Sequence, residues 1–402
     1  MDPSPAVPQA SAAPPVRLGS IDAYRGLVMF LLLAERLNIA AVAKALPDSA
    51  VWRFLHMQQE HVEWTGCVLH DMIQSSFSFL VGVALPFSVA NRRARGQPAE
   101  AVTGHAFFRA FLLVALGIFL RSSGHTQTNY TFEDTLTQIG LGYGFLYLLA
   151  LRSVRVQGIA LAVVLVGYWL VFALWPLPAV DFDWAQAGVA PDFIGNATGL
   201  AAHWNKNTNV AWAFDTWFLN LFPREKPFLF NQGGYATLSF IPTLGTMILG
   251  LLAGETLRGA RPAGEKMYWF FVAGLVGLAA GWLLGEFGIC PVVKRIWTPS
   301  WVLFSGGWCF LGLATFYALI DVQGWRRWAF PLTIIGMNSI AAYMMDHLFP
   351  GYLRETLQIH LGPRFFAIFG PAYAPFLLGV GVVVSLWLIL YWMWRKKIFL
   401  RI

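Results

Sequence analysis

A histidine and an aspartate lie at the start of a long apolar segment, in the stretch His61-Val-Glu-Trp-Thr-Gly66-Cys-Val-Leu-His-Asp71. Ionisable side chains at membrane depth cost at least about 2.5 kcal/mol each, so they are usually kept for a function. An imidazole with an ordinary pKa of about 6.5 suits a general base or a nucleophile. A nearby carboxylate would fix its tautomer and stabilise the imidazolium. The residue types therefore suit base or nucleophilic chemistry at His61 with Asp71 beside it, whereas a single membrane histidine is about as often an interface or core residue.

The spacing of these two residues sets a condition on the backbone. In one continuous helix, ten residues would place the two side chains about 80° apart. Direct contact requires a break, and Gly66 is the natural place for it. We therefore predict that the helix begins after Gly66 and that His61 folds back toward Asp71. The alternative is that Asp71 pairs with a basic side chain of another helix, Lys294 or Arg295.

Polar residues continue along one face of the helix that follows. Their spacing of three or four residues is that of an α-helix with one apolar side and one side toward water or a substrate. The stripe consists of Asp71, Gln74, Ser75, Ser78 and Gly82.

The composition indicates a polytopic membrane protein. Hydrophobic residues make up 57% of the 402 residues and charged residues only 12%, whereas a soluble domain has about 25% charged residues. The net charge of +7 is spread between apolar segments and does not indicate nucleic-acid binding. The three cysteines form no metal motif, and no metal is predicted. Cys67 and Cys290 could form one bridge, or both could be inert thiols.

The apolar segments predict an all-α fold with about ten transmembrane helices. Each is near the ~20 residues that a crossing needs, and they lie near residues 24–43, 70–90, 105–121, 135–151, 157–176, 236–254, 267–285, 300–320, 329–349 and 373–394. The Pro/Ala-rich residues 1–16 are predicted to form a disordered tail, and 17–402 a single transmembrane domain.

The positive-inside rule predicts that both ends of the chain are cytoplasmic. Short predicted inner loops such as Asn91-Arg-Arg-Ala-Arg95 are dense in arginine. Residues 177–235 then form a long extracytoplasmic loop, rich in aromatic residues and amides. Such a loop could be a folded cap, or it could hold a sugar by stacking and amide hydrogen bonds.

With this topology, many polar residues collect at the outer side. A cavity lined from several helices and open on that side explains them most simply. The candidate substrate-binding residues are Trp64, Asp134, Gln138, Asn231, Asp346 and His347.

Several motifs resemble the heparan-α-glucosaminide N-acetyltransferase family, part of the transmembrane acyltransferase superfamily. The resemblance spans about residues 17–395, and the order and spacing of the motifs make it specific. The motifs are Arg17-Leu-x-Ser-x-Asp22-x-x-Arg25-Gly26, His61-x-x-Trp64-x-Gly66 with Asp71, Gln138-Ile-Gly-Leu-x-Tyr143, Lys294-Arg-Ile-Trp-Thr-x-Ser300 and Pro331-Leu-Thr-x-x-Gly-Met-Asn338-Ser-Ile-Ala-Ala-Tyr343. Within the family, the motifs resemble those of the bacterial members called NagX. Two departures are Ser75, where the family has a proline, and the lack of a secure match for an asparagine after the first helix.

The resemblance implies a membrane enzyme that moves an acetyl group from cytosolic acetyl-CoA to an amino sugar. It implies that His61 is the catalytic histidine, acting as a general base or as an acetyl carrier, and that Asp71 is its partner. It also implies a location in the bacterial inner membrane and possible homodimerisation. The candidate acetyl-CoA contacts are Arg25, Gln74, Ser78, Lys294, Arg295, Asn338, Ser339 and Tyr343.

A membrane transporter for amino sugars is the main alternative. Ten helices, a polar pocket and an aromatic outer loop fit a carrier equally well. His61 distinguishes the two functions, because acetyl transfer requires a base and transport of a neutral sugar does not. A third interpretation is a non-catalytic acyl-CoA-binding protein.

Overall fold

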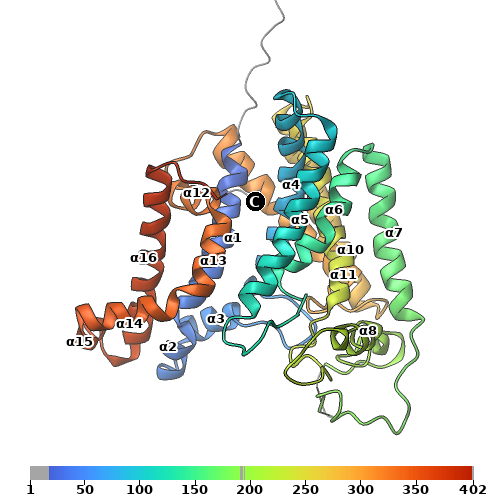
Figure 1. The fold of residues 1–402 in the computed structure, drawn as a ribbon, viewed down its shortest axis with the longest axis horizontal. Helices are drawn as coiled ribbons and strands as arrows, with labels where there is room; N and C mark the ends of the chain where they lie inside the picture. The colour runs from blue at the N-terminus through green and yellow to red at the C-terminus, as the bar shows by residue number, and fades with distance from the viewer. Residues whose placement is uncertain (1–17, 191–192, 194, 401–402) are drawn as a thin grey trace, which may run out of the picture.

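The computed structural model describes residues 18–190, 193 and 195–400, and Figure 1 shows them as a bundle of helices. Within these residues there is no β-strand beyond one isolated bridge between Thr65 and Val293. The predicted all-α fold is therefore confirmed. The predicted tail, residues 1–16, lies outside the described residues.

Each of the ten apolar segments forms a helix or a pair of helices. In chain order these are α1 (Gly19–Leu33) with η1 (Ala34–Leu37) and α2 (Ile39–Ala45), α4 (Met72–Ala94), α5 (Ala99–Arg121), α6 (Thr135–Ala150), α7 (Val154–Ala173), α9 (Phe240–Arg258), α10 (Ala263–Glu286), α11 (Pro299–Phe316), α12 (Phe330–Met337) with α13 (Ser339–Leu348), and α16 (Ala374–Arg395).

Fewer of these helices meet the length and hydropathy expected of a membrane crossing. In the described part of the chain seven helices meet them, or eight if the bent pair α1–α2 counts as one crossing. The difference from the predicted ten has two causes. Helix α6 has only 16 residues, and the ninth predicted segment is divided at Asn338 into α12 and α13.

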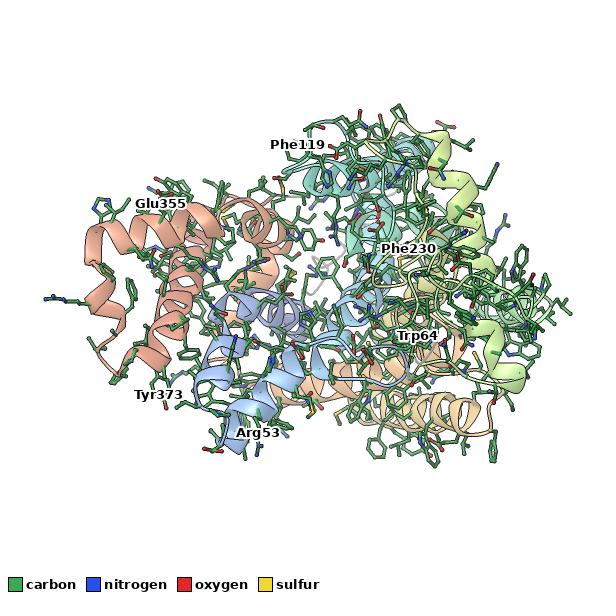
Figure 2. All side chains as sticks on the ribbon, turned by 90° about the horizontal axis from the view of Figure 1, so that it is seen from below. Arg53, Trp64, Phe119, Phe230, Glu355 and Tyr373 are labelled. Carbon is green, nitrogen blue, oxygen red and sulfur yellow. The ribbon has the colours of Figure 1, made fainter. Side chains whose placement is uncertain are left out.

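Shorter helices gather at one end of the bundle, the lower end in Figure 1. They are α3 (Ala50–Gln59), α8 (Val210–Phe218), α14 (Pro350–Leu361) and α15 (Pro363–Phe366). Figure 2 looks onto this end and shows Glu355 and Tyr373 on the opposite side from Trp64 and Phe230.

The predicted long loop forms a folded cap at the same end. It contains η3 (Gly199–Trp204), α8 and η4 (Leu219–Leu221). Trp204 is fully buried and stacks on Phe172 with the ring planes 6° apart. Of the two interpretations open for this loop, the folded cap agrees with this packing.

Glycines allow α4, which follows Asp71, to approach α9 closely. A Cβ atom on Gly250 would lie 1.9 Å from the carbonyl oxygen of Phe79, and one on Gly82 would lie 2.0 Å from that of Met247. Small residues at helix contacts let backbones approach in this way. The contact fixes α4 against the rest of the bundle and thereby the position of the residues that line its face.

Replacing Gly250 with alanine is expected to destabilise the protein by about 1–3 kcal/mol or more, because the new methyl group must displace the backbone of α4. Thermal unfolding of the purified protein in detergent would measure this loss. Gly167→Ala is the matched control, since no atom lies within 4 Å of the new Cβ position. Equal thermal stability of the two variants would contradict the packing described here.

Candidate active site

The chain is non-helical between α3 and the turn that precedes α4, and this segment brings His61 to Asp71. Gly66 has a φ of +113°, a conformation that favours glycine. Its N–H donates to the carbonyl oxygen of Val292 at 3.0 Å. Asp71 ends a short 3-10 turn, and α4 begins at Met72. The predicted break before the helix is confirmed.

His61 and Asp71 form a short hydrogen bond. The Nδ1 atom of His61 lies 2.6 Å from Oδ1 of Asp71. The carboxylate is fully buried, and its Oδ2 accepts a hydrogen bond from the backbone N–H of Val68 at 3.2 Å. A carboxylate at Nδ1 holds the proton there, which leaves Nε2 as the free proton acceptor. The pair has the geometry of a base and the group that orients it.

Lys294 completes a cluster of three charged or titratable groups. Its Nζ lies 3.9 Å from Oδ1 of Asp71 and 3.4 Å from Nδ1 of His61. Lys294, the alternative partner predicted for Asp71, therefore lies close to Asp71 at the same time as His61 does. Arg295 is not part of this cluster, because its guanidinium donates to the carbonyl oxygens of Gly233 at 2.7 Å and Val62 at 3.0 Å.

Burial shifts the pKa values of His61 and Lys294 toward their uncharged forms. The pKa of His61 is lowered from its ordinary value, chiefly because burial disfavours the imidazolium, and the Asp71 carboxylate opposes this shift. Burial lowers the pKa of Lys294 to about 8. At neutral pH the imidazole is therefore unprotonated, as a general base must be.

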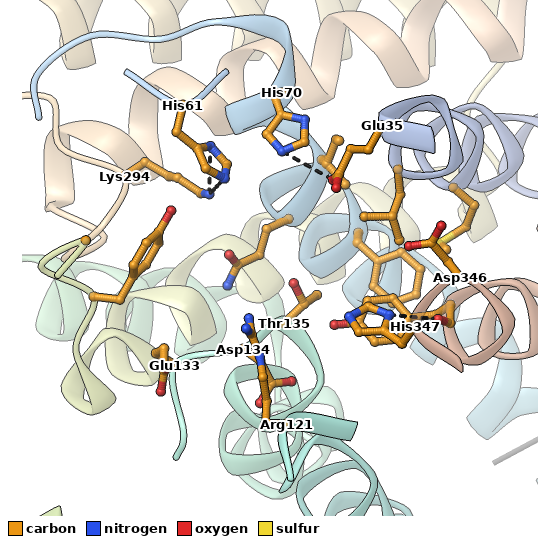
Figure 3. A pocket seen from close by; sticks show the side chains of 18 of the residues that line it. Glu35, His61, His70, Arg121, Glu133, Asp134, Thr135, Lys294, Asp346 and His347 are labelled. Carbon is orange, nitrogen blue, oxygen red and sulfur yellow. Dashed lines mark hydrogen bonds and ion pairs between the residues drawn. The ribbon is translucent and has the colours of Figure 1, made fainter. Parts of the chain in front are cut away.

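His61 and Lys294 line a cavity of about 410 Å³ at the end of the bundle that carries the cap, called here the outer cavity. Figure 3 shows side chains from several helices converging on it. Eight residues predicted from the sequence line it: His61, Gln74, Asp134, Asn231, Lys294, Tyr343, Asp346 and His347.

The outer cavity also contains charged residues that sequence reasoning did not assign to a site. Arg36 donates two hydrogen bonds to Asp346, at 2.8 and 2.7 Å. His70 lies 3.4 Å from the Glu35 carboxylate, and its ring lies 4.4 Å from that of His61. The signal in the sequence was the Glu-Arg pair inside the first apolar segment, where charges are costly.

A second cavity, of about 510 Å³, is lined by the opposite ends of the same helices; we call it the inner cavity. It is lined by the first half of α1, by α4 from Phe77 onward, by the first half of α5, by α6 and by the start of α13. Its basic residues are Arg25, Arg92, Arg95, His105 and Arg109. Ser339, predicted to contact the cofactor, also lines it.

Phe77 is the one described residue that lines both cavities. It lies in α4 two turns after Asp71, and it is largely buried, with 8% of its surface exposed. The two cavities therefore adjoin at an aromatic ring, with His61 on one side and the arginines on the other.

Six predicted site residues do not line either cavity. Trp64 is buried in the cap and donates its indole N–H to the carbonyl oxygen of Trp204 at 3.1 Å. Gln138 donates to the carbonyl oxygen of Phe132 at 2.7 Å. The remaining four are Asp71, Ser78, Arg295 and Asn338. The side chains of Trp64, Gln138 and Asn338 form hydrogen bonds within the protein, as buried polar groups generally do. The buried Oγ atom of Ser78 has no hydrogen-bond partner among the described residues.

The cysteine alternatives are resolved in favour of free thiols. Cys67 and Cys290 are both unbridged. Burial raises the pKa of Cys67 to about 12, so its thiolate is scarce and the side chain is inert.

Comparison with known proteins identifies relatives of the chain. It is 24% identical to human heparan-alpha-glucosaminide N-acetyltransferase over all of its length, and 20% identical to the mouse protein over 96% of its length. The chain is homologous to these N-acetyltransferases. It spans about three fifths of the curated relatives it matches, 62% of the human and 60% of the mouse protein. No family model matches the chain.

This homology confirms the resemblance predicted from the motifs. The match covers the whole chain, and so it spans the segments that line both cavities and those that carry His61 and Asp71. The NagX subtype stays a prediction.

Proposed function

We propose that the protein is a membrane N-acetyltransferase that moves an acetyl group from acetyl-CoA to an amino sugar of the glucosamine type. The observation that carries the proposal is the pair of adjoining cavities, one with a base and one with arginines. A transporter requires a route for the sugar itself, whereas this arrangement suits two reactants that arrive from opposite sides.

The inner cavity suits the phosphates of the coenzyme. Arginine binds phosphate through paired, charge-assisted hydrogen bonds, and Arg25, Arg92 and Arg95 lie together there. By the positive-inside rule this end of the bundle faces the cytoplasm. The acetyl end of the coenzyme would then extend past Phe77 toward His61.

The outer cavity suits the acceptor amine. Glu133 and Asn231 line it, and they offer acceptors to an ammonium group and to sugar hydroxyls. Burial raises the pKa of Glu133. Asp134 is already committed, because its Oδ1 accepts from the backbone N–H of Leu136 at 2.9 Å at the start of α6.

The chemistry requires a base, a donor to the oxyanion and the exclusion of water. Nε2 of His61 takes the proton as the amine nitrogen attacks the thioester carbon. The carbon–sulfur bond breaks, and the coenzyme leaves as a thiol after receiving that proton. The ammonium form of Lys294 lies where it can stabilise the negative oxygen. A covalent acetyl-histidine route would use the same Nε2 atom.

Vesicles reconstituted with the purified protein test the proposal. Radiolabelled acetyl-CoA is sealed on the side of the inner cavity, and glucosamine is supplied to the other side. Labelled N-acetylglucosamine on the glucosamine side is the expected result. Uptake of the sugar without acetylation would instead establish the transporter.

Replacing Arg92 with alanine is expected to weaken acetyl-CoA binding about tenfold or more, because a charge-assisted hydrogen bond is worth about 1.5–3 kcal/mol. The value of KM for acetyl-CoA should rise while kcat stays near the wild-type value. Titration calorimetry measures the affinity directly. Arg53→Ala, on the exposed face of α3, is the control, and equal affinities in both variants would remove Arg92 from the binding site.

The bacterial inner membrane, the NagX subtype and a homodimer stay predictions from the resemblance. The cytoplasmic position of both chain ends stays a prediction from the charge distribution.

A further inference from the structure

Lys294 is the only lysine among the described residues that line the outer cavity. Its side chain is 6% exposed. The Nζ atom lies 3.4 Å from Nδ1 and 3.5 Å from Nε2 of His61, and Figure 3 shows the lysine extending toward the imidazole ring. A primary amine of the protein itself therefore lies beside the base that would activate the acceptor amine.

The surroundings of Lys294 favour its reactive form. Burial lowers its pKa to about 8, so about half of the side chains are uncharged at pH 8, against roughly 0.3% for a lysine of ordinary pKa. Charged and titratable groups face Lys294 from each neighbouring segment, and two carboxylates among them oppose the loss of its proton. These groups are Glu35, His61, Cys67, Asp71, Tyr235 and Arg295.

We propose that Lys294 is a self-acetylation site, at which the protein acetylates its own side chain when no acceptor amine occupies the outer cavity. The inference rests on the proposed acetyl-CoA chemistry. The uncharged Nζ attacks the thioester carbon, forming a carbon–nitrogen bond as the carbon–sulfur bond breaks. Nε2 of His61 takes one proton from the nitrogen and returns it to the sulfur. The products are Nε-acetyl-lysine and the free thiol of the coenzyme.

Acetylation would switch the site off. An amide nitrogen carries no charge, so Asp71 loses the cation that lies 3.9 Å away. The added acetyl group also occupies the space next to His61. Because an amide does not return its acetyl group to an amine, Lys294 is a side target and not an intermediate. A bound amino sugar would protect it by taking the acetyl group first.

Incubation of the purified protein with radiolabelled acetyl-CoA alone tests the inference. The expected result is up to one acetyl group per chain, stable to hydroxylamine and located by peptide mass spectrometry at Lys294. The rate should rise about tenfold per pH unit below pH 8 and level off above it. Excess glucosamine should slow the labelling, and acetylated protein should have lost transferase activity in proportion.

Matched variants separate this reaction from non-specific acetylation. Lys294→Arg should abolish the label, and His61→Gln should slow it by about 100-fold. Lys206→Arg is the control, because Lys206 lies in the cap, also has a lowered pKa, and does not line the outer cavity. The label on this variant should equal that of the wild type.

Three results would overturn the inference. Glucosamine acetylation that proceeds normally without any label at Lys294 would refute it and leave the proposed function intact. A hydroxylamine-labile label on His61 alone would identify an acetyl-histidine instead. Failure to acetylate any amine would refute the proposed function, and this inference with it.

Discussion

Replacing His61 with alanine is expected to lower kcat for acetyl transfer by about 10²–10⁴-fold, the contribution typical of a positioned general base. The reason is structural: Nδ1 is bound to Asp71 at 2.6 Å, so Nε2 is the ring atom left to accept a proton. Radiolabelled acetyl-CoA with glucosamine gives the rate. Affinity for the coenzyme should be unchanged, because the arginines lie in the other cavity.

His360→Ala provides the control for this variant, since His360 is exposed on α14 and lies outside both cavities. The pH profile gives a second check. The unprotonated imidazole is the active form, and burial lowers its pKa. Activity should therefore be lost as pH falls through a value below the ordinary 6.5. A His61→Ala enzyme with near wild-type kcat would exclude the proposed base.

Asp71→Asn is expected to lower kcat by about 10²–10⁴-fold through a different cause. An amide can donate an N–H to Nδ1, which moves the imidazole proton to Nε2 and removes the acceptor. The substitution also leaves Lys294, which is buried, without its nearest carboxylate. The rate and its pH profile show whether the His61 imidazole has lost its orientation. Measuring thermal stability is the control for general unfolding.

The double variant tests whether the two side chains act as one unit. His61→Ala with Asp71→Asn should cost little more than His61→Ala alone, because residues that act together are strongly non-additive. Additive losses of activity would contradict the joint action of His61 and Asp71. They would favour a structural role for Asp71 as the partner of Lys294.

Much of the fold follows from the sequence, because apolar length and helical periodicity depend on neighbouring residues. All ten apolar segments are helical. The break at Gly66 was predicted because a continuous helix would place the side chains of His61 and Asp71 about 80° apart, and because a glycine lies between them. The division of the ninth apolar segment at Asn338 was not predicted. The Asn338 side chain donates to the carbonyl oxygen of Ile398 at 3.0 Å and accepts from the N–H of Leu400 at 3.1 Å. A contact across about sixty residues leaves no periodic signal.

The site could be predicted where local spacing determines it. His61 and Asp71 are ten residues apart, and the turn between them is readable. Arg36 and Asp346 are 310 residues apart, and only the folded chain shows that they neutralise each other. Trp64 and Gln138 were predicted to bind substrate but line neither cavity. Their polar groups form hydrogen bonds within the protein instead, and the sequence pattern does not distinguish the two roles.

The position of Phe77, whose side chain lines both cavities, has an electrical consequence. Where water reaches deep from both surfaces, the transmembrane voltage falls mostly across the short stretch of protein near Phe77. Moving one elementary charge across that stretch changes its electrical free energy by about 2.3 kcal/mol per 100 mV. An acetyl group is neutral, and its passage costs no electrical work, whereas the phosphates of the coenzyme would have to cross the whole field.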